Sequence, residues 1–105
     1  MKIYKVTVTP DAQDALKKYL RYLKSVKKSP QAAKSVMNDF IETRKELSAC
    51  AGSLASPDNP KLRERSLKRM NFLHHSYFML YRIDGDTAVI VNIFHSLEDI
   101  DNKLK

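Results

Sequence analysis

Two apolar runs joined by a short turn constrain the fold of this chain more than any other feature. The runs are Tyr77–Ile83 and Thr87–Phe94, and Asp84-Gly85-Asp86 lies between them. Asp-Gly between β-branched and aromatic runs predicts a β-hairpin, because a type I′ turn needs positive φ at both central positions. A turn centred on Asp84-Gly85 therefore sets the expected pairing of the two strands.

This pairing decides which side chains share a face of the hairpin, since successive residues of a strand point to opposite sides. It places Ile83 opposite Asp86 and His74 opposite His95. One face then carries Tyr77, Met79, Tyr81, Ile90 and Phe94, and the other carries Phe78, Leu80, Val89, Val91 and Ile93. Both faces are apolar, so both need cover. Helices from earlier in the chain are expected on one face, and a short C-terminal element or a partner on the other.

Periodicity and capping residues predict the remaining elements. Thr9-Pro10 and Ser29-Pro30 each place an N-cap hydroxyl before a proline at the first helical position. The expected elements are a strand over Lys2–Thr9, helices over Pro10–Lys27 and from Pro30 to about Ala51-Gly52, a long loop over Gly52–Arg65, a strand over Leu67–Phe72 and a short closing helix over Leu97–Leu104.

The predicted order is β-α-α-β-β-β-(α), an α+β fold in which a helical hairpin packs on one face of an antiparallel-rich sheet. The apolar stripe of the first helix ends in Leu23 and Val26, and that of the second includes Phe40, Ile41 and Leu47. A length of 105 residues suits a single domain over residues 1–105.

The net charge of +7 is concentrated near the start of the chain. Residues 1–28 hold eight basic and two acidic side chains, whereas residues 73–105 hold three basic and five acidic ones. A field of this kind attracts polyanions, either nucleic acid or an acidic protein. The alternative is that the charges serve solubility on solvated helix faces.

Several classes of protein are excluded or disfavoured by composition. No segment approaches the ~20 consecutive apolar residues of a membrane-spanning helix. Met1 leads almost directly into a strand-like run with no secretory leader pattern, and the lone Cys50 suits a reducing compartment, so we expect a cytoplasmic protein without membrane association. Only two glycines are present and no metal-binding spacing occurs, so neither a cofactor nor a metal is expected.

One set of residues could carry chemistry. His95 ends a predicted strand and is the best candidate for a general base or acid, with Lys68 and Arg69 as cations for a phosphorane-like transition state. Such a set fits a metal-independent ribonuclease. The alternative, which we favour from the residues alone, is a strand-end histidine among surface charges. Tyr77 and Phe78 could stack on bases, although aromatic residues at strand spacing more often form a core.

The chain resembles the RelE/ParE superfamily of type II toxin–antitoxin toxins. The residues that carry the resemblance are a basic pair entering the sheet, a Tyr-x-x-x-Tyr-Arg strand, a glycine turn, a Val/Ile-rich strand ending in histidine, then an aspartate and a closing leucine. They stand here as Lys68-Arg69, Tyr77, Tyr81-Arg82, Gly85, Val89–Ile93, His95, Asp99 and Leu104.

The resemblance implies a toxin held inactive by a cognate antitoxin, with operator DNA bound only through their complex and a toxin–antitoxin heterotetramer as the assembly. RelE-like members cleave mRNA on the ribosome, and ParE-like members inhibit DNA gyrase without hydrolysing nucleic acid. If this chain is a nuclease, the resemblance assigns catalysis to His95, Arg69 and Lys68. The expected target- or partner-binding residues are Arg65, Tyr77, Phe78, Arg82, His95, Asp99 and Leu104.

Two departures favour the ParE branch. Nucleases of the superfamily often carry an arginine where this chain has Phe78, and they often end in His-Tyr or a basic tail, whereas His95 here precedes an acidic segment. We therefore expect a gyrase inhibitor rather than an enzyme. An mRNA endonuclease and a non-toxic binding module that retains the fold are the two alternatives.

Overall fold

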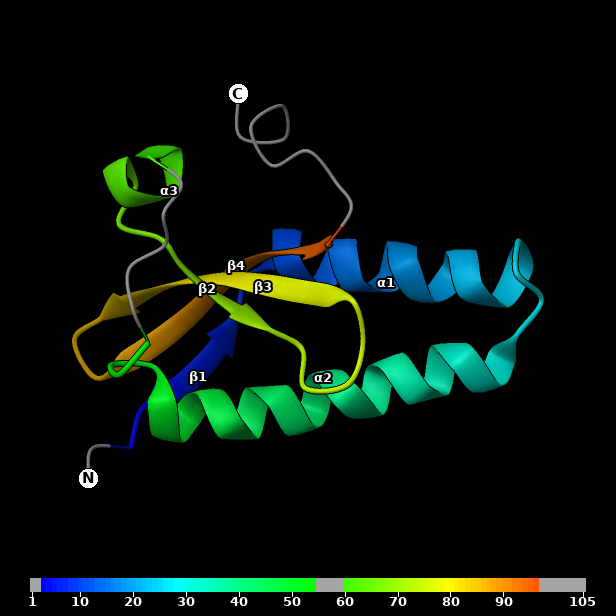
Figure 1. The fold of residues 1–105 in the computed structure, drawn as a ribbon, viewed down its shortest axis with the longest axis horizontal. Coiled ribbons are helices and arrows are strands. Elements are labelled where there is room, and N and C mark those ends of the chain that lie inside the picture. The colour runs from blue at the N-terminus through cyan, green and yellow to red at the C-terminus, as the bar shows by residue number, and fades with distance from the viewer. Residues whose placement is uncertain (1–2, 55–59, 97–105) are drawn as a thin grey trace.

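The computed structural model describes residues 3–54 and 60–96 (Figure 1). Its elements are β1 (Lys5–Val8), α1 (Pro10–Ser25), α2 (Pro30–Cys50), α3 (Pro60–Glu64), β2 (Lys68–Asn71), β3 (Tyr77–Asp84) and β4 (Thr87–His95). The predicted α+β order is confirmed, with the short α3 added inside the stretch that was expected to be a loop. The predicted closing helix, with Asp99 and Leu104, lies outside the described residues.

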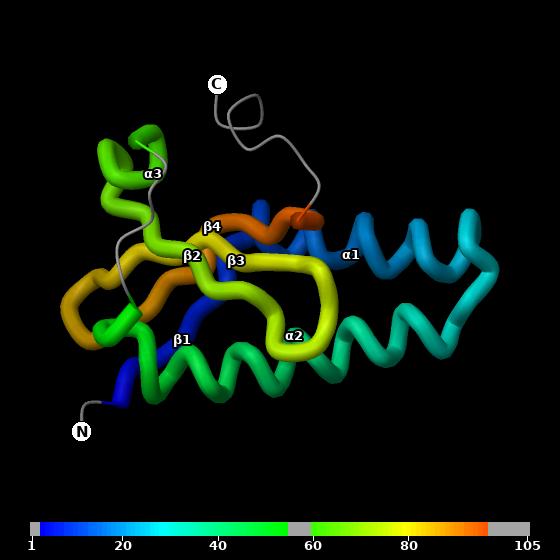
Figure 2. The backbone as a smooth tube through the Cα atoms, in the orientation of Figure 1, coloured from blue at the N-terminus to red at the C-terminus, as the bar shows by residue number. Residues whose placement is uncertain are grey.

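The four strands form one sheet in the order β1-β4-β3-β2. β1 runs parallel to β4, with Lys5 beside Thr87, and the other two pairings are antiparallel. A parallel neighbour requires a crossover connection. The helical hairpin and the strands that follow it make this crossover, and Figure 2 shows the chain passing from β1 through both long helices before it enters the sheet again.

Both predicted helix starts are confirmed by their caps. The Thr9 hydroxyl accepts a hydrogen bond from the Ala12 amide at 3.2 Å, and the Ser29 hydroxyl accepts one from the Ala32 amide at 3.2 Å. In each helix the proline follows the cap directly, where its missing N–H costs nothing. Ser29 is therefore the last residue of the short link between the two helices, and α2 begins directly after it.

The two long helices cover one face of the sheet and extend beyond its edge (Figure 1). Leu16 of α1 and Phe40 and Leu47 of α2 pack in one core with sheet residues, among them Met79 and Ile90. Val26 and Ile41, which were predicted for the helical stripes, do not join this core. Val26 is 62% exposed because it follows the last residue of α1, where the hairpin projects past the strands, and Ile41 is 42% exposed beside the buried Phe40.

The β3–β4 turn corrects the predicted pairing. Asp84 pairs with Thr87, so the two central residues are Gly85 and Asp86 rather than Asp84 and Gly85. Gly85 has a φ of 64°, whereas Asp86 is not among the residues with positive φ. Glycine at the first central position is the arrangement of a type II′ turn, and it puts the strained conformation on the residue without a side chain.

A β-bulge in the hairpin corrects the predicted faces. Tyr81 pairs with Ile90 and Leu80 pairs with Asn92, which leaves Val91 as an extra residue on β4. The extra residue reverses the alternation for the rest of the strand. Ile93 therefore joins the core beneath the helices and Phe94 lies on the opposite face, the reverse of the prediction.

The second face of the sheet is covered within the described chain. Phe78, Leu80 and Phe94 pack there with Leu62 of α3 and with Leu67. Phe78 and Leu80 have no exposed surface. The expectation that a closing element or a partner must supply the cover is therefore wrong for the centre of this face, because α3 lies in a segment whose Pro and Asn content had predicted only a loop.

Candidate functional site

A cleft at the end of the sheet brings together two of the predicted site residues. It has a volume of about 560 Å³ and is lined by residues of α1, by Lys27 just after that helix, and by the ends of β3 and β4. The lining residues are Lys18, Tyr19, Tyr22, Leu23, Lys27, Tyr77 and His95. We refer to it as the α1–His95 cleft.

Aromatic contacts fix the floor of the α1–His95 cleft. Tyr77 and His95 are paired across β3 and β4, and their rings meet edge to face with centroids 5.1 Å apart. The Tyr19 ring lies 5.1 Å from that of Tyr77, and the Tyr19 hydroxyl accepts a hydrogen bond from the His95 amide at 3.1 Å. The position of His95 is thus determined by α1 as well as by the strand, which the pattern of the sequence did not indicate.

The electrostatics of the α1–His95 cleft are basic. Lys18 and Lys27 are exposed at its rim, with the Lys27 ammonium 5.9 Å from the Tyr22 ring centroid, and none of the described residues that line it is acidic. Burial raises the pKa of the Tyr77 phenol, and the nearby Tyr22 phenol adds to the increase. The cleft therefore offers cations, phenols and an imidazole, a combination suited to binding an acidic or aromatic group.

The structure does not bring together the three residues predicted for catalysis. Lys68 donates a hydrogen bond from Nζ to the Leu54 carbonyl at 2.8 Å. Arg69 pairs with Leu80 on the second face of the sheet, and its guanidinium carbon lies 3.8 Å from the centre of the Phe78 ring. His95 lies on the helix-covered face beside Tyr77. The cations and the imidazole are therefore on different parts of the molecule.

The other predicted binding residues are dispersed. Arg65, after α3, and Arg82, on β3, are exposed, whereas Phe78 is completely buried beneath Arg69. Position 78, where an arginine would be expected in a nuclease of the superfamily, thus holds a buried phenylalanine with the guanidinium of Arg69 stacked on its ring. Asp99 and Leu104 lie outside the described residues.

His74 and His75 lie elsewhere than predicted. The shifted register places Tyr77 rather than His74 opposite His95, and both histidines belong to the loop between β2 and β3, which contacts α2. His74 Nε2 lies 3.2 Å from Glu42 Oε2, and His75 Nδ1 donates to Asp39 Oδ2 at 2.6 Å. The prediction that His74 and His95 are neighbours is wrong.

Asp39 is a functional candidate that the sequence reasoning missed. Its side chain is 1% exposed, and it accepts hydrogen bonds from the His74 amide, from the Thr43 hydroxyl and from His75. Burial alone would raise the pKa of this carboxyl, but these hydrogen bonds outweigh burial and hold the pKa below its usual range. Asp39 lies one turn from Val36 and Thr43 on the buried side of α2, and an acid on an apolar stripe was the signal available in the sequence.

Two kinds of feature are absent from the part of the chain that the structure describes. No cluster of three or more His, Cys, Asp or Glu side chains is arranged to hold a metal ion there. Within the same residues, no helix combines the length and apolar character needed to cross a membrane.

Two solved structures share this fold. A chain from the chromosomal ParDE toxin–antitoxin system of P. aeruginosa superposes with a TM-score of 0.69 at 18% identity, covering 89% of this chain and 96% of that one. A chain from the RelBE2 toxin–antitoxin complex of Mycobacterium tuberculosis gives a TM-score of 0.62 at 24% identity, covering 93% and 97%. The fold is therefore of the RelE/ParE class, as the resemblance predicted.

The amino-acid sequence assigns the chain to one family within this class. Residues 6–100 match the family model described as the ParE toxin of the type II toxin–antitoxin system parDE. This chain belongs to the ParE toxin family, and it is the toxin component of a type II toxin–antitoxin system. No curated protein sequence matches the chain.

Proposed function

We propose that this toxin inhibits DNA gyrase and is not a ribonuclease. The observation that carries the proposal is the separation of His95 from Arg69 and Lys68, together with the family match over residues 6–100. Cleavage of RNA without a metal needs a base, an acid and cations around one scissile phosphate. Here the Arg69 guanidinium is stacked on Phe78 and the Lys68 ammonium is bonded to a backbone carbonyl.

A protein target does not impose the same requirement. Binding to gyrase needs a complementary surface with a few well-packed anchors rather than cations at one atom. The α1–His95 cleft supplies tyrosines, a histidine and two lysines in one place. Tyrosine is among the residues that contribute most to interfaces, because its ring buries a large area and its hydroxyl keeps a polar contact. We propose this cleft as part of the target surface.

We further propose a cognate antitoxin as the physiological partner. The two structural relatives come from toxin–antitoxin systems. β1 and β2 are the edge strands of the sheet, and an extended segment can add to such an edge by main-chain hydrogen bonds. Pairing of two toxin–antitoxin dimers into a heterotetramer, with operator DNA bound through the antitoxin, completes the proposal.

A RelE-like nuclease is the second candidate. The RelBE2 relative and the exposed lysines beside His95 favour it. In this case Lys18 and Lys27, rather than Lys68 and Arg69, would be the cations nearest to the imidazole. A nuclease of this kind would use a different set of residues from the one that the sequence predicted.

One experiment separates the two candidates. Purified toxin is assayed in parallel for inhibition of gyrase supercoiling and for cleavage of ribosome-bound mRNA, with His95→Ala and Arg69→Ala as variants. We expect inhibition of supercoiling, relief of that inhibition by the purified antitoxin, and intact mRNA. Robust cleavage that His95→Ala abolishes would overturn the proposal. Absence of both activities would leave the fold serving a non-toxic binding module.

A further inference from the structure

A hydroxyl, an imidazole and a buried carboxylate form a chain of contacts on α2, away from the α1–His95 cleft. Ser35 Oγ lies 3.1 Å from His75 Nε2, and His75 Nδ1 lies 2.6 Å from Asp39 Oδ2. The same order of contacts activates the nucleophile in serine hydrolases of unrelated folds, where the arrangement is recognised by geometry rather than by sequence order.

Asp39 determines which nitrogen of His75 carries the proton. An ionised carboxylate only accepts hydrogen bonds, so in neutral His75 the proton is on Nδ1 and Nε2 is the acceptor. The Ser35 hydroxyl therefore donates to Nε2, which is the arrangement that a general base requires. Asp39 is held in place by the His74 amide at 3.1 Å and by the Thr43 hydroxyl at 3.2 Å.

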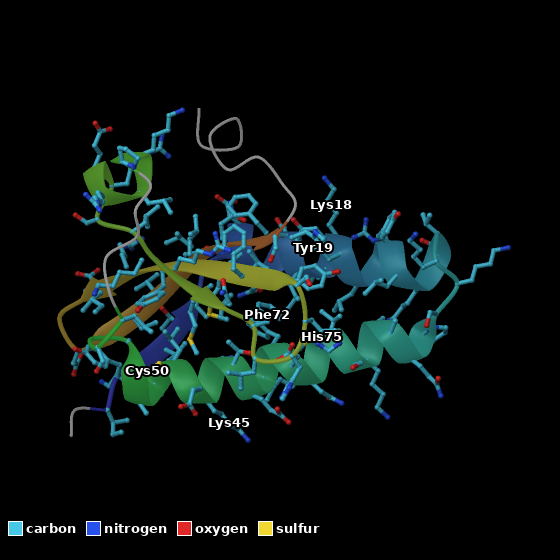
Figure 3. All side chains as sticks on the ribbon, in the orientation of Figure 1. Lys18, Tyr19, Lys45, Cys50, Phe72 and His75 are labelled. Carbon is cyan, nitrogen blue, oxygen red and sulfur yellow. The ribbon has the colours of Figure 1, made fainter. Side chains whose placement is uncertain are left out.

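One helix and one short loop supply the three residues. Ser35 and Asp39 are four residues apart in α2, so both point to the same side of the helix. His75 comes from the short loop that returns to β3, where the Tyr77 amide donates to the His75 carbonyl at 2.9 Å. Figure 3 shows His75 beside α2, where this loop approaches the helix.

A cleft of about 330 Å³ lies beside the hydroxyl. Gln31 and Asn38, four residues before and three residues after Ser35, line it together with Lys34. Side-chain amides and ammonium groups are donors of the kind that stabilise an oxyanion. Ser35 is exposed and the His75 side chain is 30% exposed, so a small molecule can reach both.

We propose that Ser35 is a nucleophile that accepts an acyl group from small activated carboxylic esters. A bond forms between Ser35 Oγ and the ester carbonyl carbon while the bond from that carbon to the alcohol oxygen breaks. The hydroxyl proton moves to His75 Nε2 and then to the departing alcohol. Water, activated in the same way, releases the acid and restores Ser35. Asp39 is a positioning residue in this scheme.

The competing explanation is that the three residues only fasten the β2–β3 loop to α2. An anchor would hold the loop equally well without any reactivity at Ser35. The two explanations therefore differ in the covalent chemistry of one hydroxyl, and this can be measured directly.

The test uses the intact chain with a fluorophosphonate probe and with p-nitrophenyl acetate. Mass spectrometry locates the modified residue. The variants are Ser35→Ala and His75→Gln, and the matched control is Ser48→Ala, since Ser48 is a serine of the same helix whose hydroxyl donates to the Tyr4 carbonyl at 2.7 Å. We expect labelling at Ser35, its loss in Ser35→Ala, a decrease of about 100-fold or more in His75→Gln, and no change in Ser48→Ala.

Substitution of Asp39 tests the positioning role. His75 is contacted by Asp39 and Ser35, and the other ionisable groups of the cleft are Lys34, Glu42 and His74. Asp39→Asn should slow the labelling of Ser35, because an amide can donate as well as accept and so no longer fixes the proton of His75 on Nδ1, and Asp39→Glu should restore part of the rate. A folded chain, judged by circular dichroism, that carries no label on Ser35 would overturn the proposal, as would equal labelling in His75→Gln.

Discussion

Individual buried polar groups account for much of the specificity of this fold. The Tyr81 side chain is fully buried in the core, and its hydroxyl donates to the Ala51 carbonyl at 2.7 Å, joining the centre of β3 to the end of α2. Burial is the main reason that the pKa of Tyr81 is well above its ordinary value, with smaller contributions from Cys50 and Tyr4. The phenol is therefore neutral in the folded chain at any physiological pH.

Tyr81→Phe tests this contact. The substitution keeps the ring and removes the only group that donates from this side chain, so we expect the free energy of unfolding to fall by about 1–3 kcal/mol. Because the pKa of Tyr81 is raised by folding, its contribution is present below the pKa of the unfolded chain, about 10, and is lost as the pH rises above that value. Urea denaturation between pH 7 and pH 11 should show a shallower alkaline decline in Tyr81→Phe. An unchanged decline would contradict this account.

The contribution of Asp39 to stability should depend on pH in the opposite direction. Its pKa is lowered by folding, so the folded chain binds fewer protons than the unfolded chain at acid pH. The stabilisation is therefore present above about pH 4 and is lost as the pH falls through the lowered pKa. Asp39→Asn should be less stable at pH 7 and should lose less stability on acidification. Asp14→Asn, which alters an exposed carboxyl on α1, is the control and should follow the unaltered chain.

At the scale of the elements, the features that depend on local residue types could be predicted from the sequence. The features that depend on packing between distant segments could not. The caps at Thr9 and Ser29 and the existence of the hairpin follow from residue types, and all are present. The extra residue Val91 has no local signature, because every residue around it is a normal strand former. The α1–His95 cleft depends on this bulge and on the position of α1. The sequence therefore predicted Tyr77 and His95 as site residues but not the residues of the cleft that surround them.

Gly85→Ala tests the corrected turn. Gly85 has a φ of 64°, and an alanine held in the left-handed region costs roughly 1–2 kcal/mol, although there is open space around its α-carbon. Asp86→Ala is the matched control at the second central position, and it should cost less because the backbone there does not have positive φ. Thermal unfolding of both variants gives the comparison. A larger loss in Asp86→Ala would contradict the assignment of the turn.

At the scale of the whole molecule, the charged side chains are distributed unevenly. Residues 1–28 carry a net charge of +6, and they include both lysines of the α1–His95 cleft, Lys18 in α1 and Lys27 just after it. Lys18 and the labelled Lys45 of α2 lie on opposite sides of the molecule in Figure 3. If the α1–His95 cleft is part of the target surface, binding to the target must depend on where a charge lies and not only on the total charge of the chain.

Charge reversal at two positions tests this argument on the proposed gyrase target. In Lys18→Glu/Lys27→Glu both substituted side chains are exposed, so we expect the fold to be kept. The toxin concentration that half-inhibits supercoiling should increase about tenfold at low salt, and the difference should shrink as added salt screens the interaction. The comparison variant, Lys45→Glu/Lys34→Glu, changes the net charge equally through two exposed lysines of α2. An equal loss in both pairs would mean that only net charge steers binding, and no loss in either would remove the α1–His95 cleft from the target surface.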